Sequence, residues 1–345
     1  MHEPLSFTLE RLARLTGALL KGDGSHLITG IEDLDSANPS QAAFLENPRY
    51  ERQMKNSQAG VVFIHPTVSC IEGRNYLVTE TPSLAFQKVI ELFLKPALSG
   101  FEGIHPSAVI HSESELGENV TVGPCAVIDR KSRIGRGSHI GAGCFVGAEV
   151  TIGEDCLLHP KSVVRERSVL GNRVILQPGA IVGSCGYGYH TDKKGHHSPL
   201  KQLGNVVIED DVEIGANTTI DRARFKTTVI RKGSKIDNLV QIAHQVSIGE
   251  HNLIVSQTGI AGSSTTGNHV VLAGQVGIVG HISIADRVVL AARSAVIKSI
   301  EAGGVYSGAP ALPIMEFNEQ AVHIRNIGKL MKRVAALEQA LSKKT

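Results

Sequence analysis

The chain has 345 residues, which is enough for two or more domains. Hydrophobic residues make up 42% of it, aromatic residues only 4%, and glycine occurs 36 times, so thin and regular stacking is favoured over a bulky layered core. The formal net charge of +2 excludes a global field that would recruit nucleic acid or an anionic membrane.

Five cysteines are scattered along the chain, and no two of them form a C-x-x-C pair. This argues against a disulfide framework or a zinc knuckle and fits a reducing compartment. The first residues lack a charged stretch followed by an apolar one, so no signal peptide is expected. No apolar run approaches the roughly 20 residues of a membrane span. We therefore expect a cytoplasmic protein with no transmembrane segment and no nucleic-acid partner.

Residues 1–103 contain no repeat and predict a small α/β domain. Thr8 has the properties of a helix N-cap, and Gly17 lies where that helix should end. The expected elements are, in chain order, a helix over 7–20, a buried strand over 60–64, a second strand over 75–79 and an amphipathic helix over 83–94.

From residue 104 an aliphatic side chain recurs at every sixth position. The series runs from Ile104 to Val182, resumes over 208–220 after an excursion at 183–207, and restarts at Ile230 after a slip at 222–226. It then runs to Val296, and Thr266 is its only non-aliphatic position. A period of six fits a coil of three short flat faces, whose aliphatic residues stack inside on counterparts three hexads away. The 29 hexads predict nine to ten coils within residues 104–310.

Residues 311–345 form a separate helical segment in this interpretation. Apolar residues alternate at spacings of three and four, which is the pattern of a coiled-coil seam: Ile327, Leu330, Val334, Leu337 and Leu341. Two heptads are too short to be stable alone, so the segment should bundle with copies of itself. A three-faced prism and a terminal zipper together favour a homotrimer with cyclic symmetry.

A coil of three hexads also aligns the polar residues of successive turns. His244 should lie below Gly262, Gly280 and Lys298, and the neighbouring column should contain Gln245, Ser263 and His281. Two glycines above a histidine leave a groove in which backbone N–H groups approach a ligand closely. We expect the groove to hold an extended thioester arm, with its carbonyl carbon near His244 and an anionic group near Lys298.

Four sequence segments carry a resemblance to a known family: Phe44–Tyr50 (FLENPRY), Gly186–Tyr189 (GYGY), Thr218–Arg222 (TTIDR) and Ile236–His244 (IDNLVQIAH). With its domain order and length, the chain resembles the UDP-3-O-acylglucosamine N-acyltransferases of lipid A biosynthesis, which are hexapeptide-repeat acyltransferases. The resemblance implies a mainly β fold built on a left-handed parallel β-helix. This handedness runs against the usual crossover rule and does not follow from the spacing.

The resemblance also implies roles for residues of the repeat domain. His244 would be the general base, His281 a second histidine near the reacting centre, and the backbone N–H of Gly262 would face the oxyanion. Asn238 and Gln241 would contact the donor's 3-hydroxyacyl chain, and Asp237 would support His244. Two positions depart from the family pattern, because Ala223 and Gln245 stand where other residues are common.

In the first domain the resemblance implies that Phe44, Asn47 and Tyr50 hold the uracil end of a UDP-sugar, with one ring stacked on the base. The donor would be an acyl-carrier protein, whose phosphopantetheine arm carries the acyl chain, so no permanently bound cofactor is expected. Basic residues of the last segment could steer that acidic partner: Arg325, Lys329, Lys332 and Arg333. The basic excursion at 183–207 fits a solvated loop and a flap over the cleft equally well.

Other functions remain open at this point. A nucleotide-sugar acetyltransferase that uses acetyl-coenzyme A would need a short apolar groove rather than a long one. A zinc enzyme of the carbonic-anhydrase type would need a ligand set, and no H-x-x-x-H or paired-carboxylate spacing provides one, so no metal is expected. A non-catalytic β-helical protein would lack the polar residues around His244. The acyl chain length, the subunit that forms each side of the cleft and the coil register after the slip stay undetermined.

Overall fold

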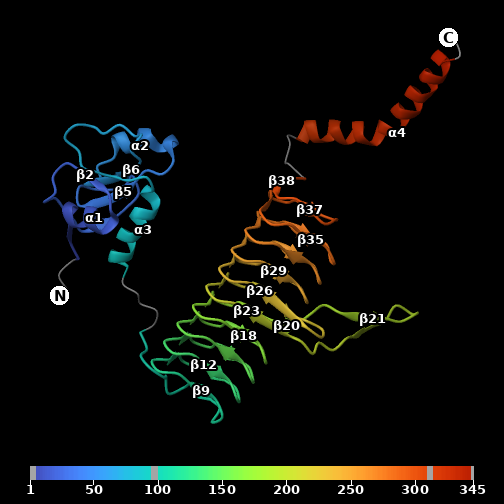
Figure 1. Ribbon diagram of the computed structural model, residues 1–345, viewed down its shortest axis with the longest axis horizontal. Coiled ribbons are helices and arrows are strands. Elements are labelled where there is room, and N and C mark those ends of the chain that lie inside the picture. The colour runs from blue at the N-terminus through green and yellow to red at the C-terminus, as the bar shows by residue number, and fades with distance from the viewer. Residues whose placement is uncertain (1–4, 95–99, 309–313, 343–345) are drawn as a thin grey trace. The chain divides into compact units, whose positions relative to one another are not determined.

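A computed structural model describes residues 5–94, 100–308 and 314–342. The chain divides into two compact units, residues 1–98 and 99–345, which are shown in Figure 1. The first unit combines helices with a small sheet, and the second contains a long parallel solenoid and a helix that follows it.

The first unit is an α/β domain around one five-stranded sheet with the strand order β2-β7-β6-β5-β4. Its elements are β1 (Phe7–Thr8), α1 (Leu9–Thr16), β2 (Leu19–Lys21), β3 (Leu27–Ile28), β4 (Gly30–Ile31), β5 (Gln41–Phe44), the 3-10 helix η1 (Pro48–Tyr50), α2 (Glu51–Asn56), β6 (Val61–Ile64), β7 (Tyr76–Val78) and α3 (Pro82–Phe93).

Local sequence explains the ends of these elements. The Thr8 side chain accepts a hydrogen bond from the Arg11 backbone, and Gly17 ends α1 in the left-handed conformation at φ 72°. Both expected helices and both expected strands are present, but the first helix covers only Leu9–Thr16, and both ends of its expected range, residues 7–8 and 19–20, belong to strands. The sequence analysis did not identify β1 to β5, η1 and α2, which are too short to show a long apolar period.

The second unit is a solenoid whose coils each place one strand in each of three parallel sheets. Face 1 contains β10 (Thr121–Val122), β13 (His139–Ile140), β16 (Leu157–Leu158), β19 (Ile175–Leu176), β24 (Glu213–Ile214), β27 (Lys235–Ile236), β30 (Leu253–Ile254), β33 (Val271–Leu272), β36 (Val288–Leu290) and β38 (Gly304–Tyr306).

Face 2 contains β8 (Val109–Ile110), β11 (Val127–Ile128), β14 (Phe145–Val146), β17 (Val163–Val164), β20 (Ile181–Cys185), β25 (Thr219–Arg222), β28 (Gln241–Ile242), β31 (Gly259–Ile260), β34 (Gly277–Ile278) and β37 (Ala295–Val296). Face 3 contains β9 (Glu115–Leu116), β12 (Arg133–Ile134), β15 (Thr151–Ile152), β18 (Val169–Leu170), β23 (Asn205–Ile208), β26 (Thr227–Ile230), β29 (Ser247–Ile248), β32 (Thr265–Thr266) and β35 (Ser283–Ile284). The sheets of 10, 10 and 9 strands match the predicted nine to ten coils.

The six-residue series forms the core of the solenoid. Every member from Val122 to Val296 is buried, and its members pair in register from coil to coil, as Ile242 does with Ile260. Thr266 fits this apolar column because its hydroxyl accepts hydrogen bonds from the buried Asn252 side chain and from the Gly249 backbone. A buried polar pair that satisfies itself replaces one aliphatic contact there.

Two coils are longer than the regular three hexads, and the structure fixes the register that the sequence left open. Val182 pairs with Ile220 across the first of them, and Ile220 pairs with Ile242 across the second. The strands on either side return to regular pairing. The excursion contains a two-stranded antiparallel hairpin of β21 (Tyr189–Thr191) and β22 (His197–Pro199), visible in Figure 1 as a projection beside β20.

The last element is α4 (Ile314–Ser342), in which the predicted seam residues are exposed. Among the described residues, no helix is both long and apolar enough to cross a membrane.

Candidate active site

The His244 side chain lies between two glycines that come from different parts of the chain. A methyl group added at Gly262, one coil on, would lie 2.5 Å from the ring Cε1 and 2.7 Å from Nε2. One added at Gly186, in the excursion, would lie 2.9 Å from the His244 Cβ. Any larger residue at either position would displace the imidazole. Both glycines are therefore required by the close approach of the His244 side chain and not by their backbone conformation.

The predicted columns of residues are confirmed by the backbone hydrogen bonds. The Ser263 N–H donates to the His244 carbonyl at 3.0 Å, and the His281 N–H donates to the Gly262 carbonyl at 3.1 Å. Gln245, Ser263 and His281 share the same turn position, with φ of 61°, 64° and 63°. His281 therefore lies two coils from Gln245 at the same corner, with an exposed side chain.

A bare apolar groove runs along face 2 beside this corner. Gln241 pairs with Gly259, which pairs with Gly277, so two successive coils present no side chain there. The groove has a volume of about 500 Å³ and is lined by Gln241, Ala243, Gly259, Ile260, Ala261, Gly277, Ile278, Val279, Ala295, Val296 and Ile297. Apart from Gln241 at one end, its lining is apolar, and it therefore suits an extended arm or an alkyl chain.

Asp221 provides the buried carboxylate of this region. It is 6% exposed and accepts hydrogen bonds from the Ser184 hydroxyl and, at 2.9 Å, from the Gln241 amide. Burial raises the pKa of Asp221, while the hydrogen bond from Ser184, the positive charge of a protonated His244 and the hydrogen bond from Gln241 oppose part of that rise.

A neighbouring ion pair lines a cavity of about 780 Å³ together with Asp221, Gln241 and the aromatic excursion. Arg222 is 2% exposed and donates to Glu166 at 2.7 Å and to the Gly183 carbonyl at 2.8 Å. Burial alone would raise the pKa of Glu166, but hydrogen bonds from Arg165 and Arg222 outweigh it and lower that pKa to about 2. The walls include Tyr187 and Tyr189, whose rings meet edge to face.

Within one chain, Asp237 and Asn238 do not join this cluster. They follow β27 on face 1 and line a separate cavity of about 500 Å³. The Asp237 carboxylate accepts from the backbones of Asn238 and Ser256, and the Asn238 amide oxygen accepts from the Ala216 backbone. Within one chain a full face separates Asp237 from His244, so support of His244 by Asp237 stays a prediction that needs a second subunit, and Asp221 is the carboxylate of the same chain whose pKa is affected by His244.

In the first unit, the three residues expected to hold uracil lie in or just after β5. Phe44 stacks on Phe86 with ring centroids 4.8 Å apart, so its ring is partly used by the core. The Asn47 side chain caps η1 through the Arg49 backbone, and Tyr50 is 52% exposed. Of the two aromatic rings, that of Tyr50 is the more exposed and therefore the more accessible to a ligand.

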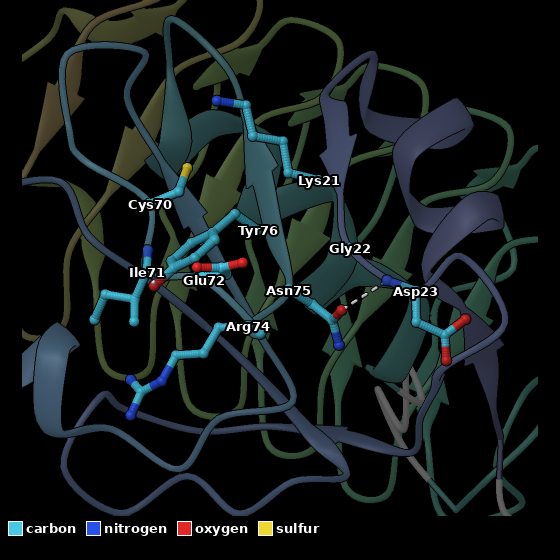
Figure 2. Close-up of a pocket in the computed structure, with 10 residues that line it drawn as sticks. Lys21, Gly22, Asp23, Cys70, Ile71, Glu72, Arg74, Asn75 and Tyr76 are labelled. Carbon is cyan, nitrogen blue, oxygen red and sulfur yellow. Dashed lines mark hydrogen bonds between the residues drawn. The ribbon is translucent and has the colours of Figure 1, made fainter.

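The same unit also contains a cavity of about 540 Å³ between β2 and the loop that precedes β7 (Figure 2). Its wall is held by Asn75, which accepts a hydrogen bond from the Asp23 backbone at 2.8 Å, the dashed line in Figure 2. None of Phe44, Asn47 and Tyr50 is among its lining residues.

No group of three His, Cys, Asp or Glu side chains gathers at a metal-binding distance within residues 5–94, 100–308 and 314–342.

Comparisons with known proteins identify the family of this chain. The family model described as UDP-3-O-(3-hydroxymyristoyl) glucosamine N-acyltransferase, LpxD, matches residues 25–92, and the bacterial transferase hexapeptide model matches residues 149–184. The UDP-3-O-acylglucosamine N-acyltransferase of Protochlamydia amoebophila is 59% identical over 98% of this chain and 97% of its own length. That of Chlamydia pneumoniae is 56% identical over 98% of this chain and 95% of its own length.

The chain belongs to the UDP-3-O-acylglucosamine N-acyltransferase family. It is therefore an N-acyltransferase. Among solved structures, an Arabidopsis UDP-N-acetylglucosamine acyltransferase covers 59% of this chain and 71% of its own with a TM-score of 0.52; at 23% identity this likeness supports the solenoid fold alone.

Two parts of the site were missed by sequence reasoning. Gly186 and Asp221 stood inside the segments that carried the resemblance, yet neither received a role. The lengths of the two irregular coils were the missing signal. The extra residues of both coils lie between a strand of face 2 and a strand of face 3. His244 lies at the same corner, so these extra residues are close to it.

We predict that Gly262→Ala folds but loses about a hundredfold in turnover, because the added methyl group displaces the His244 ring and a misplacement of about 1 Å can cost that much. Steady-state kinetics and circular dichroism test this. Gly30→Ala is the matched control, because its methyl group meets only Gln41 at ordinary distances of 3.5 and 3.7 Å. Full turnover in Gly262→Ala would show that the ring position does not matter.

Proposed function

We propose that this enzyme transfers a 3-hydroxyacyl chain from acyl-carrier protein to the 2-amino group of UDP-3-O-acylglucosamine in lipid A biosynthesis, with His244 as the general base. The observation that carries the proposal is the imidazole held against the Gly262 backbone at the end of a bare apolar groove. The family membership supports the same acceptor.

The chemistry requires a base and an oxyanion donor close together. The attacking amine must lose a proton, and an imidazole, which titrates near neutrality, is suited to accept it. The Nδ1 atom of His244 is buried and has no hydrogen-bond partner among the described residues, so the proton of the amine would be accepted at Nε2. The Gly262 N–H would stabilise the developing oxyanion, and His281, at the same corner, would assist near the reacting carbonyl.

The groove on face 2 would hold the donor. A phosphopantetheine arm is extended and its acyl chain is apolar, and both need the open space that Gly259 and Gly277 leave. Lys298, which is exposed one coil beyond Gly280, would meet an anionic group at the mouth. The donor would bring this arm itself, so we propose no resident cofactor. The basic residues of α4 would attract the acidic carrier protein.

A homotrimer of left-handed solenoids would bring the divided site together. Asn238 and His244 stand at opposite ends of face 2, so a second copy could set its Asn238 corner against the His244 corner of the first. The exposed seam of α4 supports association, because Leu330 and Leu337 are 59% and 62% exposed. A cytoplasmic location stays a prediction.

His244→Ala should remain folded and lose turnover by at least about a hundredfold, the lower range for a general base. The assay supplies UDP-3-O-acylglucosamine with either acylated carrier protein or acetyl-coenzyme A, and follows consumption of the donor. His251→Ala is the matched control, since that histidine is exposed at the corner between faces 3 and 1. Near-normal turnover in His244→Ala removes this residue from the mechanism, and consumption of acetyl-coenzyme A alone favours the acetyltransferase.

Tyr50→Ala should weaken the affinity for the UDP-sugar, because stacking of an aromatic ring on a base contributes about 1–3 kcal/mol. Isothermal titration calorimetry of the intact protein measures this. Leu19→Ala in the same unit removes an exposed apolar side chain and serves as the control. Unchanged affinity in Tyr50→Ala would make its ring structural.

Mixed oligomers test the shared cleft. His244→Ala and Asn238→Ala should each be inactive alone, whereas an equal mixture assembled together should recover about a quarter of native turnover, because a quarter of the interfaces combine two intact corners. No recovery upon mixing would place the whole site within one chain.

A further inference from the structure

Asp221 and His244 are connected through the same two segments of chain. The Asp221 carboxylate is held by Ser184 from one segment and by Gln241 from the other. Two residues beyond Ser184, Gly186 touches His244; three residues beyond Gln241 is His244 itself. The carboxylate and the imidazole therefore keep a fixed relation, although no direct hydrogen bond joins them in the described chain.

The other charged groups that line the same cavity as Asp221 are Glu166, Arg222 and the exposed Lys201. Arg222 is paired with Glu166, which also accepts from Arg165. On the excursion, Cys185 and Tyr187 are exposed, and His281 is exposed on the turn beyond Gly262. Asp221 is the one buried carboxylate among these groups that has no cationic side chain as a hydrogen-bond partner.

We infer that Asp221 is a positioning residue for the acyl transfer, and that its charge stabilises the imidazolium formed when His244 accepts the proton of the amine. This inference rests on the proposed function. The carboxylate also orients the Gln241 amide at the entrance to the groove. It acts through these two side chains and not on the substrate itself, unlike the aspartate of a hydrogen-bonded catalytic triad.

Burial of the charged Asp221 carboxylate is unfavourable for the stability of the fold. A positioning role can therefore be distinguished from a structural role by measuring stability together with activity. The pKa of Asp221 is raised chiefly by burial, so folding makes the neutral form more favourable than it is in the unfolded chain. That preference stabilises the fold at low pH and is lost as the pH rises above the carboxyl's unfolded value of 3.8. The charged form of Asp221 is therefore less favourable in the folded protein than in the unfolded chain, and Asp221→Asn removes that charge with almost no change in side-chain size.

The experiment compares native protein, Asp221→Asn and Asp286→Asn. Asp286 carries the same charge in an exposed turn at the corner between faces 3 and 1. Three quantities are measured: the pH profile of kcat/KM, the NMR titration midpoint of the His244 ring in the free protein, and the melting temperature at pH 7 and pH 4. His244 is assigned with the His244→Ala variant.

Asp221→Asn is expected to lower kcat about tenfold or more, and to move both the acid limb of the profile and the His244 midpoint to lower pH. Its melting temperature should be unchanged or higher at pH 7, with the difference narrowing at pH 4. Asp286→Asn should match native protein in the kinetic and NMR measurements.

Two results would overturn the inference: an unmoved His244 midpoint, or an activity loss that accompanies a fall in melting temperature at pH 7. The first leaves the proposed function intact if native protein still consumes the acyl donor. Failure of native protein to consume any donor would refute the proposed function, while the NMR titration would still decide whether Asp221 acts on His244.

Discussion

The stacking of one coil on the next is the constraint on which the site depends. Parallel pairing repeats every three hexads and buries the aliphatic series in three columns, one for each face, so each residue has a fixed neighbour on the next coil. That regularity brings Gly262 against the His244 ring and leaves Gly259 beside Gly277. A histidine on an independent loop would lack this backbone support. Here the hydrophobic stacking of the coils fixes the position of the His244 ring before any substrate binds.

Much of this arrangement follows from sequence arithmetic. The period predicted the solenoid, its number of coils and the column of Gln245, Ser263 and His281, because a repeat restricts each residue to one position in the coil. Thr266 interrupts the aliphatic series, and the hydrogen bond that its hydroxyl accepts from the Asn252 side chain explains how it is accommodated in the core. The first domain was predicted less completely, since β1 to β5, η1 and α2 are too short to show a period.

The remaining part of the site could not be predicted, because it lies where the repeat is interrupted. Residue counting assigns neighbours only along regular coils, and the two longer coils break that rule. Asp221 gained its contact with Ser184 only through the longer of the two, and Gly186 reached His244 the same way. The family resemblance implied that Asp237 supports His244, yet within one chain an intervening face separates them. Contacts between irregular segments depend on three-dimensional closure, which local patterns do not encode.

Both long coils leave and re-enter the ladder at the corner between faces 2 and 3, and the strands on either side keep their pairing. The consequence concerns how such an enzyme could diversify. Insertions at this corner leave folding to the unaltered coils, so the walls around the histidine are free to vary in length and composition. Substrate preference could thus change through insertions at one corner of the solenoid while the sequence of the other coils stays the same.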